Sequence, residues 1–333
     1  MTLPLSSVRW GVIGAGDVVE HKSGPALQRA ERSSLVAVMR RDGAAAADFA
    51  GRHGVPRWYD DADALIADPE VDAVYVATPP SSHMEHTLRA AAAGKPVYSE
   101  KPMARTAAEA QTMIDACDAA GVPLFVAYYR RAMPRFVTVK ALLDDGAIGE
   151  PRTVEAVNAS PGKAWEPQHL PWRLDPEISG GGLFVDLGSH TLDLLDHLFG
   201  PVEEVHGIAR RRAGTTAAED HVVAALSFAN DVVGTGTWAY DAHERVDEVV
   251  VRGTRGALRF SMFGQEPLVL RTDAGERQID APYPDVVQQP LIQTIVDELT
   301  GRGTSPSTGR TALRTAAVVD AILAEHRART RQP

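Results

Sequence analysis

The first 130 residues alternate between short apolar runs and longer segments with helical periodicity. Apolar runs without a period of two predict strands that are buried on both faces of a sheet. These runs fall at residues 8–14, 34–39, 71–77, 97–99 and 124–128. The helical segments fall at residues 17–30, 44–53, 61–66, 82–93 and 106–120. This alternation predicts a doubly wound parallel sheet, an α/β fold with helices on both faces.

The pattern changes after residue 130, where a helical segment at 134–144 leads into a series of strand-like runs. These runs fall at residues 153–158, 204–210, 221–228, 232–239, 248–252, 257–261 and 268–271. Further helices are predicted at 182–199, 288–300 and 312–330. Thr254 and Arg255 stand between two glycines and predict a tight hairpin. We therefore expect residues 1–127 to form a nucleotide-binding domain. Residues 128–333 are expected to form an α+β domain with a large, mostly antiparallel open sheet.

The charge balance argues against polyanionic partners. The 333 residues include 34 basic and 44 acidic side chains, which give a net charge of −10. This excess repels nucleic acid and anionic membrane surfaces. The chain begins with a short segment that leads directly into an apolar strand, so we expect no targeting segment and a cytoplasmic location. The single cysteine, Cys117, lies in a predicted helix, where a buried, inert thiol is expected.

A glycine turn joins the first strand to the first helix. Gly14 and Gly16 match the first two glycines of a dinucleotide-binding turn, while Val19 stands at the third position. In this strand–turn–helix context, we expect a nucleotide to bind here, although a merely tight turn is the alternative. The expected contacts are Gly11, Gly14, Ala15, Gly16, Asp17 and Val18.

Cofactor choice is expected to depend on the residues after the second strand. Arg40 and Arg41 suit the 2′-phosphate of NADP, which guanidinium groups can bind in a bidentate manner. Alternatively, both arginines are solvated loop charges and Asp42 reaches the ribose hydroxyls of NAD. We favour NADP over NAD on this basis.

Two further segments carry groups suited to proton transfer. Lys101 follows a strand of the nucleotide-binding domain, at the edge of the sheet where ligands bind. The alternative is a surface lysine before a proline turn. Three glycines at 180–182 open a helix on which Asp186 and His190 stand four residues apart, on one face. A carboxylate beside an imidazole can orient the ring and raise its proton affinity. Asp193 lies on the same helix face as Asp186 and His190, so a metal site is an alternative. No metalloprotease pattern or thiolate cluster accompanies these residues, so we expect no metal.

Substrate contacts are expected from two loops. Tyr128 and Arg130 follow the last strand of the first domain, and Trp172 and Arg173 lie on the long loop before the glycines. An aromatic face and a guanidinium suit a polyhydroxylated ring by stacking and hydrogen bonding. Ordinary loop packing explains the same residues. His83 is expected beside the cofactor at a helix start, where cap packing is the alternative.

The order and spacing of these motifs resemble the Gfo/Idh/MocA oxidoreductase family, which includes glucose–fructose oxidoreductase and inositol dehydrogenases. The resemblance covers nearly the whole chain and includes the sequence Ala-Thr-Pro-Pro at 77–80. It implies a Rossmann domain and hydride exchange between NAD(P) and a sugar, cyclitol or related polyol. The implied catalytic residues are Lys101, Asp186 and His190. The implied cofactor contacts include Thr78, Pro79, Pro80, Glu100, Lys101 and Pro102.

The resemblance also implies roles and an assembly. His190 would accept the hydroxyl proton, Asp186 would orient its ring, and Lys101 would stabilise the developing alkoxide. An open C-terminal sheet of this kind implies a homodimer or homotetramer. Two alternatives stay open. One is an NAD-retaining glycosidase that acts by transient oxidation, and the other is a non-catalytic nucleotide-binding sensor.

Overall fold

The computed structural model describes residues 5–163, 165, 169–212 and 216–330. It divides into two compact units. The first comprises Met1–Met133 and Pro284–Leu313, and the second comprises Pro134–Tyr283 and Arg314–Pro333. This division differs from the expected boundary at residue 127, because residues 284–313 belong to the first unit. The physical reason is helix α9 (Gln289–Leu299), whose apolar face is buried in the same core as the first strand.

The first unit contains a six-stranded sheet in the order β3-β2-β1-β4-β5-β6, and all its strand pairs are parallel. Its strands are β1 (Val8–Ile13), β2 (Ser33–Met39), β3 (Arg57–Tyr59), β4 (Ala73–Val76), β5 (Val97–Ser99) and β6 (Leu124–Val126). This sheet confirms the doubly wound α/β fold. Strand β3 was not expected, because this three-residue edge strand has no fully buried side chain.

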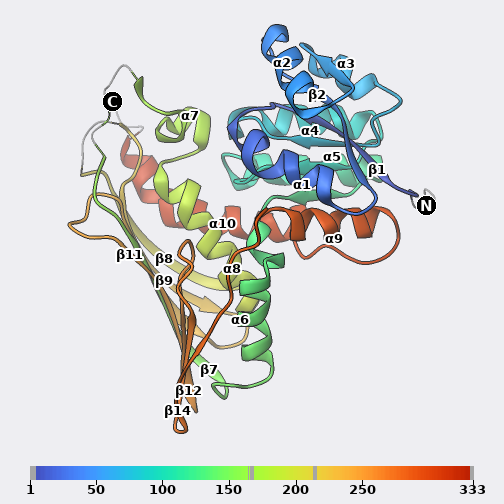
Figure 1. The fold of residues 1–333 in the computed structure, drawn as a ribbon. Coiled ribbons are helices and arrows are strands. Elements are labelled where there is room, and N and C mark those ends of the chain that lie inside the picture. The colour runs from blue at the N-terminus through green and yellow to red at the C-terminus, as the bar shows by residue number, and fades with distance from the viewer. Residues whose placement is uncertain (1–4, 164, 166–168, 213–215, 331–333) are drawn as a thin grey trace. The chain divides into compact units, whose positions relative to one another are not determined.

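Helices follow the strands of the first unit (Figure 1). They are η1 (Val19–Ser23), α1 (Gly24–Arg29), α2 (Gly43–His53), α3 (Ala62–Ala67), η2 (Pro80–Ser82), α4 (His83–Ala92), α5 (Ala107–Ala120) and η3 (Tyr129–Ala132). The side chains of Asp42, Asp61 and Thr106 cap α2, α3 and α5 by accepting a hydrogen bond from a backbone N–H in the first turn. Gly54 and Gly121 end α2 and α5 in the left-handed conformation, which glycine adopts without steric cost.

The second unit contains an eight-stranded sheet in the order β14-β13-β12-β11-β7-β10-β9-β8. Its strands are β7 (Pro151–Ala159), β8 (Val202–Arg210), β9 (His221–Phe228), β10 (Val233–Ala239), β11 (Val246–Gly253), β12 (Gly256–Phe260), β13 (Leu268–Thr272) and β14 (Gly275–Ile279). Only the β7–β10 pair is parallel among these strands, so the mostly antiparallel sheet is confirmed. Strand β14 was not expected, because it is a polar edge strand.

One face of this sheet packs against helices, as Figure 1 shows for α8 and α10. The helical elements are α6 (Pro134–Asp144), η5 (Trp172–Leu174), α7 (Pro176–Ser179), η6 (Phe184–Gly188), α8 (Ser189–Phe199) and α10 (Gly309–Thr330). Phe199 packs edge-on against Phe228, with ring centroids 5.4 Å apart. Gly207 lets α10 approach β8, because a Cβ there would lie 2.8 Å from the Cα of Ile322. Side chains on the other face alternate outward and are largely exposed.

No helix in the described ranges is long and apolar enough to span a bilayer.

Candidate functional site

The glycine turn of the first unit lies where the strand order reverses, between β1 and β4. Gly14 has a φ of +91° and donates its N–H to the Met39 carbonyl, 3.0 Å away. A Cβ at this position would lie 2.9 Å from the Thr78 backbone nitrogen. The chain therefore needs glycine here for both conformation and space. Gly14 and Thr78 thus meet at the carboxyl ends of neighbouring strands, the position at which doubly wound sheets bind ligands.

The other residues of the turn divide into two groups. Gly11 lies inside β1, where a Cβ would come within 2.7 Å of Leu65, so packing accounts for this glycine. Ala15 donates its N–H to Met39, and the Gly16 carbonyl accepts the first hydrogen bonds of the following helix. Asp17 and Val18 continue directly into η1. This helix opens in a π conformation at Val19, which is fully buried, so the valine at the third glycine position serves the core.

His83 connects two of the segments expected to bind the cofactor. It starts α4 and is fully buried. Its Nε2 lies 2.7 Å from the Thr78 carbonyl oxygen, and its Nδ1 lies 3.1 Å from the carbonyl oxygen of Pro102. Burial lowers the pKa of His83, although these carbonyl contacts oppose the shift. His83 therefore fixes the turn at 78–80 to the segment after Lys101, which is a positioning role.

Glu100 holds the backbone at Lys101. Its buried carboxylate accepts hydrogen bonds from the Tyr75 hydroxyl at 2.7 Å and from the Gln288 side-chain amide at 2.9 Å. The second carboxylate oxygen accepts a hydrogen bond from the Lys101 N–H at 3.0 Å. The Lys101–Pro102 peptide bond is cis, and the Lys101 side chain is partly exposed. Gln288 was missed in the sequence, because 188 residues separate it from Glu100 and no local pattern marks it.

The residues after β2 that were expected to influence cofactor choice differ in their local contacts. The Asp42 carboxylate accepts a hydrogen bond from Ala45 N at 3.1 Å and so serves as the N-cap of α2. Arg40 is anchored through its backbone N–H, which donates to the Tyr59 carbonyl, and its side chain is partly exposed. The Arg41 side chain is exposed. The guanidinium groups are thus presented at the end of β2, whereas Asp42 is engaged in the cap.

Tyr128 and Arg130 lie after β6 in the first unit, and both are almost completely buried. The Arg130 guanidinium carbon lies 5.1 Å from the centroid of the Tyr129 ring. The neighbouring Arg131 donates a hydrogen bond to the carbonyl of Pro306. This segment therefore packs into the first unit, and Arg131 helps to hold the returning segment 284–313.

In the second unit, short distances connect three of the expected side chains, Trp172, Arg173 and Asp186. Asp186 lies on the π-helical segment η6, and His190 lies in the first turn of α8, which continues it. The Arg173 Nε lies 3.3 Å from the Asp186 Oδ2, and its guanidinium carbon lies 4.6 Å from the Trp172 ring centroid. The loop residues expected from the sequence thus adjoin the carboxylate. Short π segments inside helices frequently occur at functional sites.

His190 is nearly buried, with 4% of its surface exposed. Its ring packs edge-on against Phe263, with centroids 6.2 Å apart. An imidazole with restricted solvent access on the same helical segment as a partly exposed carboxylate is equipped for general acid–base chemistry. The later acidic residues of α8 face α10 instead of extending the row of Asp186 and His190. Asp193 accepts a hydrogen bond from Thr315, and Asp196 pairs with Arg314, both of α10.

A buried carboxylate lies against two of the three glycines that precede Asp186, whereas Gly180 ends α7 in the left-handed conformation. Glu219 accepts a hydrogen bond from Gly182 N at 2.7 Å and is 2% exposed. A Cβ on Gly182 would lie 2.5 Å from the Glu219 carbonyl oxygen, and one on Gly181 would lie 3.1 Å from its carboxylate. Burial raises the pKa of Glu219 to about 7. In the sequence only the glycines indicated a close contact at this position. Glu219 itself could not be predicted, because it lies 37 residues after Gly182.

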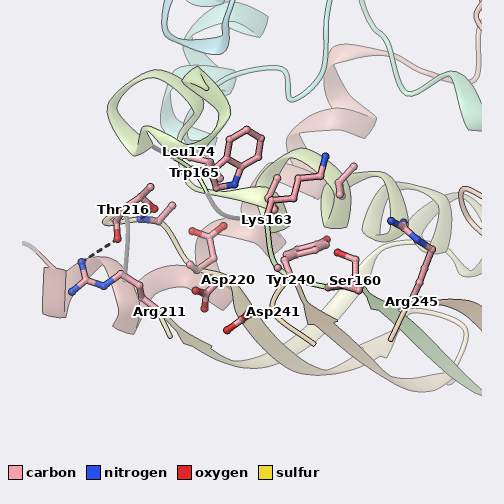
Figure 2. A pocket seen from close by; sticks show the side chains of 16 residues that line it. Ser160, Lys163, Trp165, Leu174, Arg211, Thr216, Asp220, Tyr240, Asp241 and Arg245 are labelled. Carbon is pink, nitrogen blue, oxygen red and sulfur yellow. Dashed lines mark hydrogen bonds between the residues drawn. The ribbon is translucent and has the colours of Figure 1, made fainter. Parts of the chain in front are cut away.

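A cavity of about 460 Å³ lies beside this carboxylate, and all its lining residues belong to the second unit. Figure 2 shows Lys163, Trp165, Tyr240 and Arg245 among the side chains around it. None of these four residues was expected from the sequence, because they stand in loops and at strand ends without a recognisable spacing.

Two family profiles match the chain. The profile described as the oxidoreductase family with an NAD-binding Rossmann fold matches residues 8–128. The profile of the GFO/IDH/MocA C-terminal domain matches residues 136–259.

Several known proteins are similar over nearly the whole length. Oxidoreductase P35 of Formosa agariphila is 37% identical over 317 residues, which are 95% of this chain and 98% of that relative. The 1,5-anhydro-D-fructose reductase of Ensifer adhaerens is 30% identical over 308 residues, 90% of this chain and 91% of the reductase. A solved oxidoreductase from Agrobacterium radiobacter, in complex with NAD+, L-tartaric acid and magnesium, has a TM-score of 0.86 at 25% identity and covers 98% of both chains.

Proposed function

Because the chain belongs to the Gfo/Idh/MocA family of oxidoreductases, we propose that it transfers a hydride between NAD(P) and a sugar, cyclitol or related polyol. The reacting carbon is a carbinol in one direction and a ketone in the other. The similarity to an anhydrofructose reductase supports a sugar-like substrate. The observation that carries the proposal most strongly is the Gly14 turn, which leaves no room for a Cβ against Thr78.

The residues around this turn fit a dinucleotide. Gly14 and Gly16 allow close approach of the pyrophosphate, and Thr78-Pro79-Pro80 and Lys101-Pro102 form the two segments that His83 joins. When bound, the nicotinamide ring supplies the hydride acceptor or donor. The protein supplies the proton chemistry and the electrostatic stabilisation.

We assign proton transfer to His190 and stabilisation of the developing alkoxide to Lys101. In oxidation, the carbinol carbon loses a hydride while the His190 imidazole accepts the hydroxyl proton, so one proton and one hydride leave the substrate. The Lys101 ammonium stabilises the developing alkoxide. Asp186 holds the ring in a productive orientation, and its contact with Arg173 fixes the carboxylate in turn. Reduction runs these steps in reverse.

Substitution of the two catalytic residues tests this assignment. We expect Lys101→Met and His190→Asn each to lower kcat about 10²–10⁴-fold, the usual contribution of a positioned proton-transfer group. Binding of NAD(P)H, followed by its fluorescence, is expected to persist in both variants. Lys140→Met is the matched control, because Lys140 forms a surface pair with Asp144 on α6. Unchanged turnover in either catalytic variant would refute the assignment.

We propose NADP as the preferred cofactor. The presentation of Arg40 and Arg41 at the end of β2 supports this choice, as does the engagement of Asp42 in the α2 cap. A panel of sugars, cyclitols and keto-sugars with NAD(H) and NADP(H), followed by absorbance of the reduced nicotinamide, measures the preference. A higher kcat/KM with NAD(H) would refute it. Release of free sugar from a glycoside without net cofactor turnover would instead indicate an NAD-retaining glycosidase.

We also propose a homo-oligomer formed through the open face of the eight-stranded sheet. Ile208 and Val223 are cross-strand neighbours on this face and are 60% and 50% exposed, and Val233 is 51% exposed. Adjacent exposed aliphatic side chains of this kind are typical of protein interfaces. Light scattering on the wild type and on Ile208→Lys tests the proposal. A wild-type monomer would contradict it.

A further inference from the structure

The second unit contains a cavity with the features of a ligand-binding site. The proposed acid/base residues, Asp186 and His190, do not line it. Its walls come from the segment after β7, from residues near the start of β9, from the end of β10 and from η6. A volume of about 460 Å³ falls within the range of small-molecule sites. The cavity therefore has room for a part of a ligand other than the reacting carbinol.

Tyr240 is the clearest indication that the cavity binds a polar group. The residue is 5% exposed and lines the cavity, and its hydroxyl has no hydrogen-bond partner within the described part of the chain. A buried hydroxyl without a partner costs free energy, so such groups are normally satisfied by water or by a ligand. Burial raises the pKa of Tyr240 well above its ordinary value, so the hydroxyl keeps its proton and can donate it in a hydrogen bond.

The cavity adjoins the helical segment that carries Asp186. Leu183 and Leu187 line it, and Asp186 stands between them on this segment. The charge of Asp186 also acts on Tyr240, where it adds to the effect of burial on the pKa. A ligand that reaches from Asp186 past Tyr240 would therefore occupy both the acid/base site and the cavity.

The lining suits a polyhydroxylated ring. Trp165 offers an aromatic surface, and the Lys163 ammonium lies 5.8 Å from its ring centroid. Asp241 adds a carboxylate beside Gly162, where a Cβ would lie 2.5 Å from Oδ1. Sugar rings present apolar C–H faces and a rim of hydroxyls. An aromatic surface flanked by donors and acceptors is therefore complementary to them. Figure 2 labels Lys163, Trp165 and Asp241 among the side chains that line the cavity.

We infer that the cavity binds a second glycosyl unit, linked to the sugar that is oxidised beside Asp186 and His190. The substrate is then a glycoside or an oligosaccharide, which deepens the proposed function and rests on it. Oxidation removes one hydride and one proton from the reacting unit and leaves the glycosidic bond intact. The second unit contributes binding free energy through contacts with Tyr240 and Trp165.

The experiment compares glucose with cellobiose and maltose as probes, in the wild type and in Tyr240→Phe, at saturating NAD(P)+. We expect at least one disaccharide to exceed glucose in kcat/KM. Tyr240→Phe should lower kcat/KM for that disaccharide about fivefold, the usual effect of one lost hydrogen bond, and leave glucose unchanged. Trp165→Leu provides a second variant with the same expected pattern. Binding of each disaccharide to the NAD(P)+ complex, measured by calorimetry, gives a readout that is independent of turnover.

The possible outcomes test the second glycosyl site separately from the proposed function. Turnover of glucose without any disaccharide advantage, or an equal loss for glucose and disaccharide in Tyr240→Phe, would overturn the second glycosyl site while leaving the proposed function intact. Absence of turnover with any sugar or polyol of the panel would overturn the proposed function. Disaccharide binding that both variants leave unchanged would exclude this cavity as the binding site.

Discussion

Replacement of Glu219 by glutamine tests how the acid/base helix is held. The carboxylate of Glu219 is almost completely buried and accepts a hydrogen bond from Gly182 N, four residues before Asp186. Burial raises its pKa from 4.5 to about 7, although the hydrogen bonds from the backbone and the charge of Arg327 oppose this rise. The folded protein therefore favours the protonated carboxyl group below about pH 7.

The magnitude follows from linkage between protonation and folding. A rise in pKa from 4.5 to about 7 corresponds to roughly 3 kcal/mol, at about 1.4 kcal/mol for each pH unit. Because the folded-state pKa is the higher one, this stabilisation is fully present below pH 4.5 and is lost as the pH rises through about 7. Glutamine is neutral at every pH and has nearly the same shape. Relative to the wild type, Glu219→Gln should therefore gain about 2.5 kcal/mol between pH 5 and pH 8, because the wild type has already lost part of this stabilisation at pH 5.

Thermal unfolding at pH 5, 6, 7 and 8 measures this difference. For a unit of this size, about 2.5 kcal/mol corresponds to a relative shift in Tm of roughly 5–10 °C. Glu204→Gln is the matched control, because Glu204 is exposed on β8. A difference between Glu219→Gln and the wild type that stays constant from pH 5 to pH 8 would refute the reasoning.

Three further predictions concern other parts of the chain. Gly14→Ala should weaken NAD(P)H binding at least about tenfold in a fluorescence titration, because the Cβ would lie 2.9 Å from Thr78 N at a φ of +91°; unchanged affinity would contradict this. Arg314→Met should lower the free energy of unfolding by about 3 kcal/mol in urea, because it leaves the buried Asp196 carboxylate without its paired guanidinium; a loss below about 1 kcal/mol would show that the pair contributes little. Burial raises the pKa of Cys117 to about 11, so its thiol should resist a disulfide reagent at pH 8 until the protein unfolds; rapid labelling of the native protein would disprove it.

Local patterns in the sequence predicted most of the regular elements, and residues without such patterns were missed. Buried strands such as 71–77 produced apolar runs that are visible in the sequence. The edge strands β3 and β14 lack them, because an edge position lets polar side chains face water. The Gly180–Gly182 run and the Asp186–His190 spacing were visible as well. Their partner Glu219 was not, because contacts between distant segments leave no periodic trace.

The same limit applies to the domain boundary. Helix α9 has an ordinary amphipathic pattern, and nothing in it indicates which unit receives its apolar face. The family profiles divide the chain between residues 128 and 136, close to the boundary that the change of pattern suggested. The return of residues 284–313 to the first unit became visible only in the buried contacts of α9 with the first sheet.

This return has a consequence for the order in which the protein folds during synthesis. The nucleotide-binding unit receives part of its core from α9, which is synthesised only when almost nine-tenths of the chain has been made. The glycine turn and its strands therefore emerge early but stay incomplete while the whole eight-stranded sheet is synthesised. The first unit can therefore be completed only after all strands of the second sheet have been synthesised, and most of α10, which belongs to the second unit, follows later still.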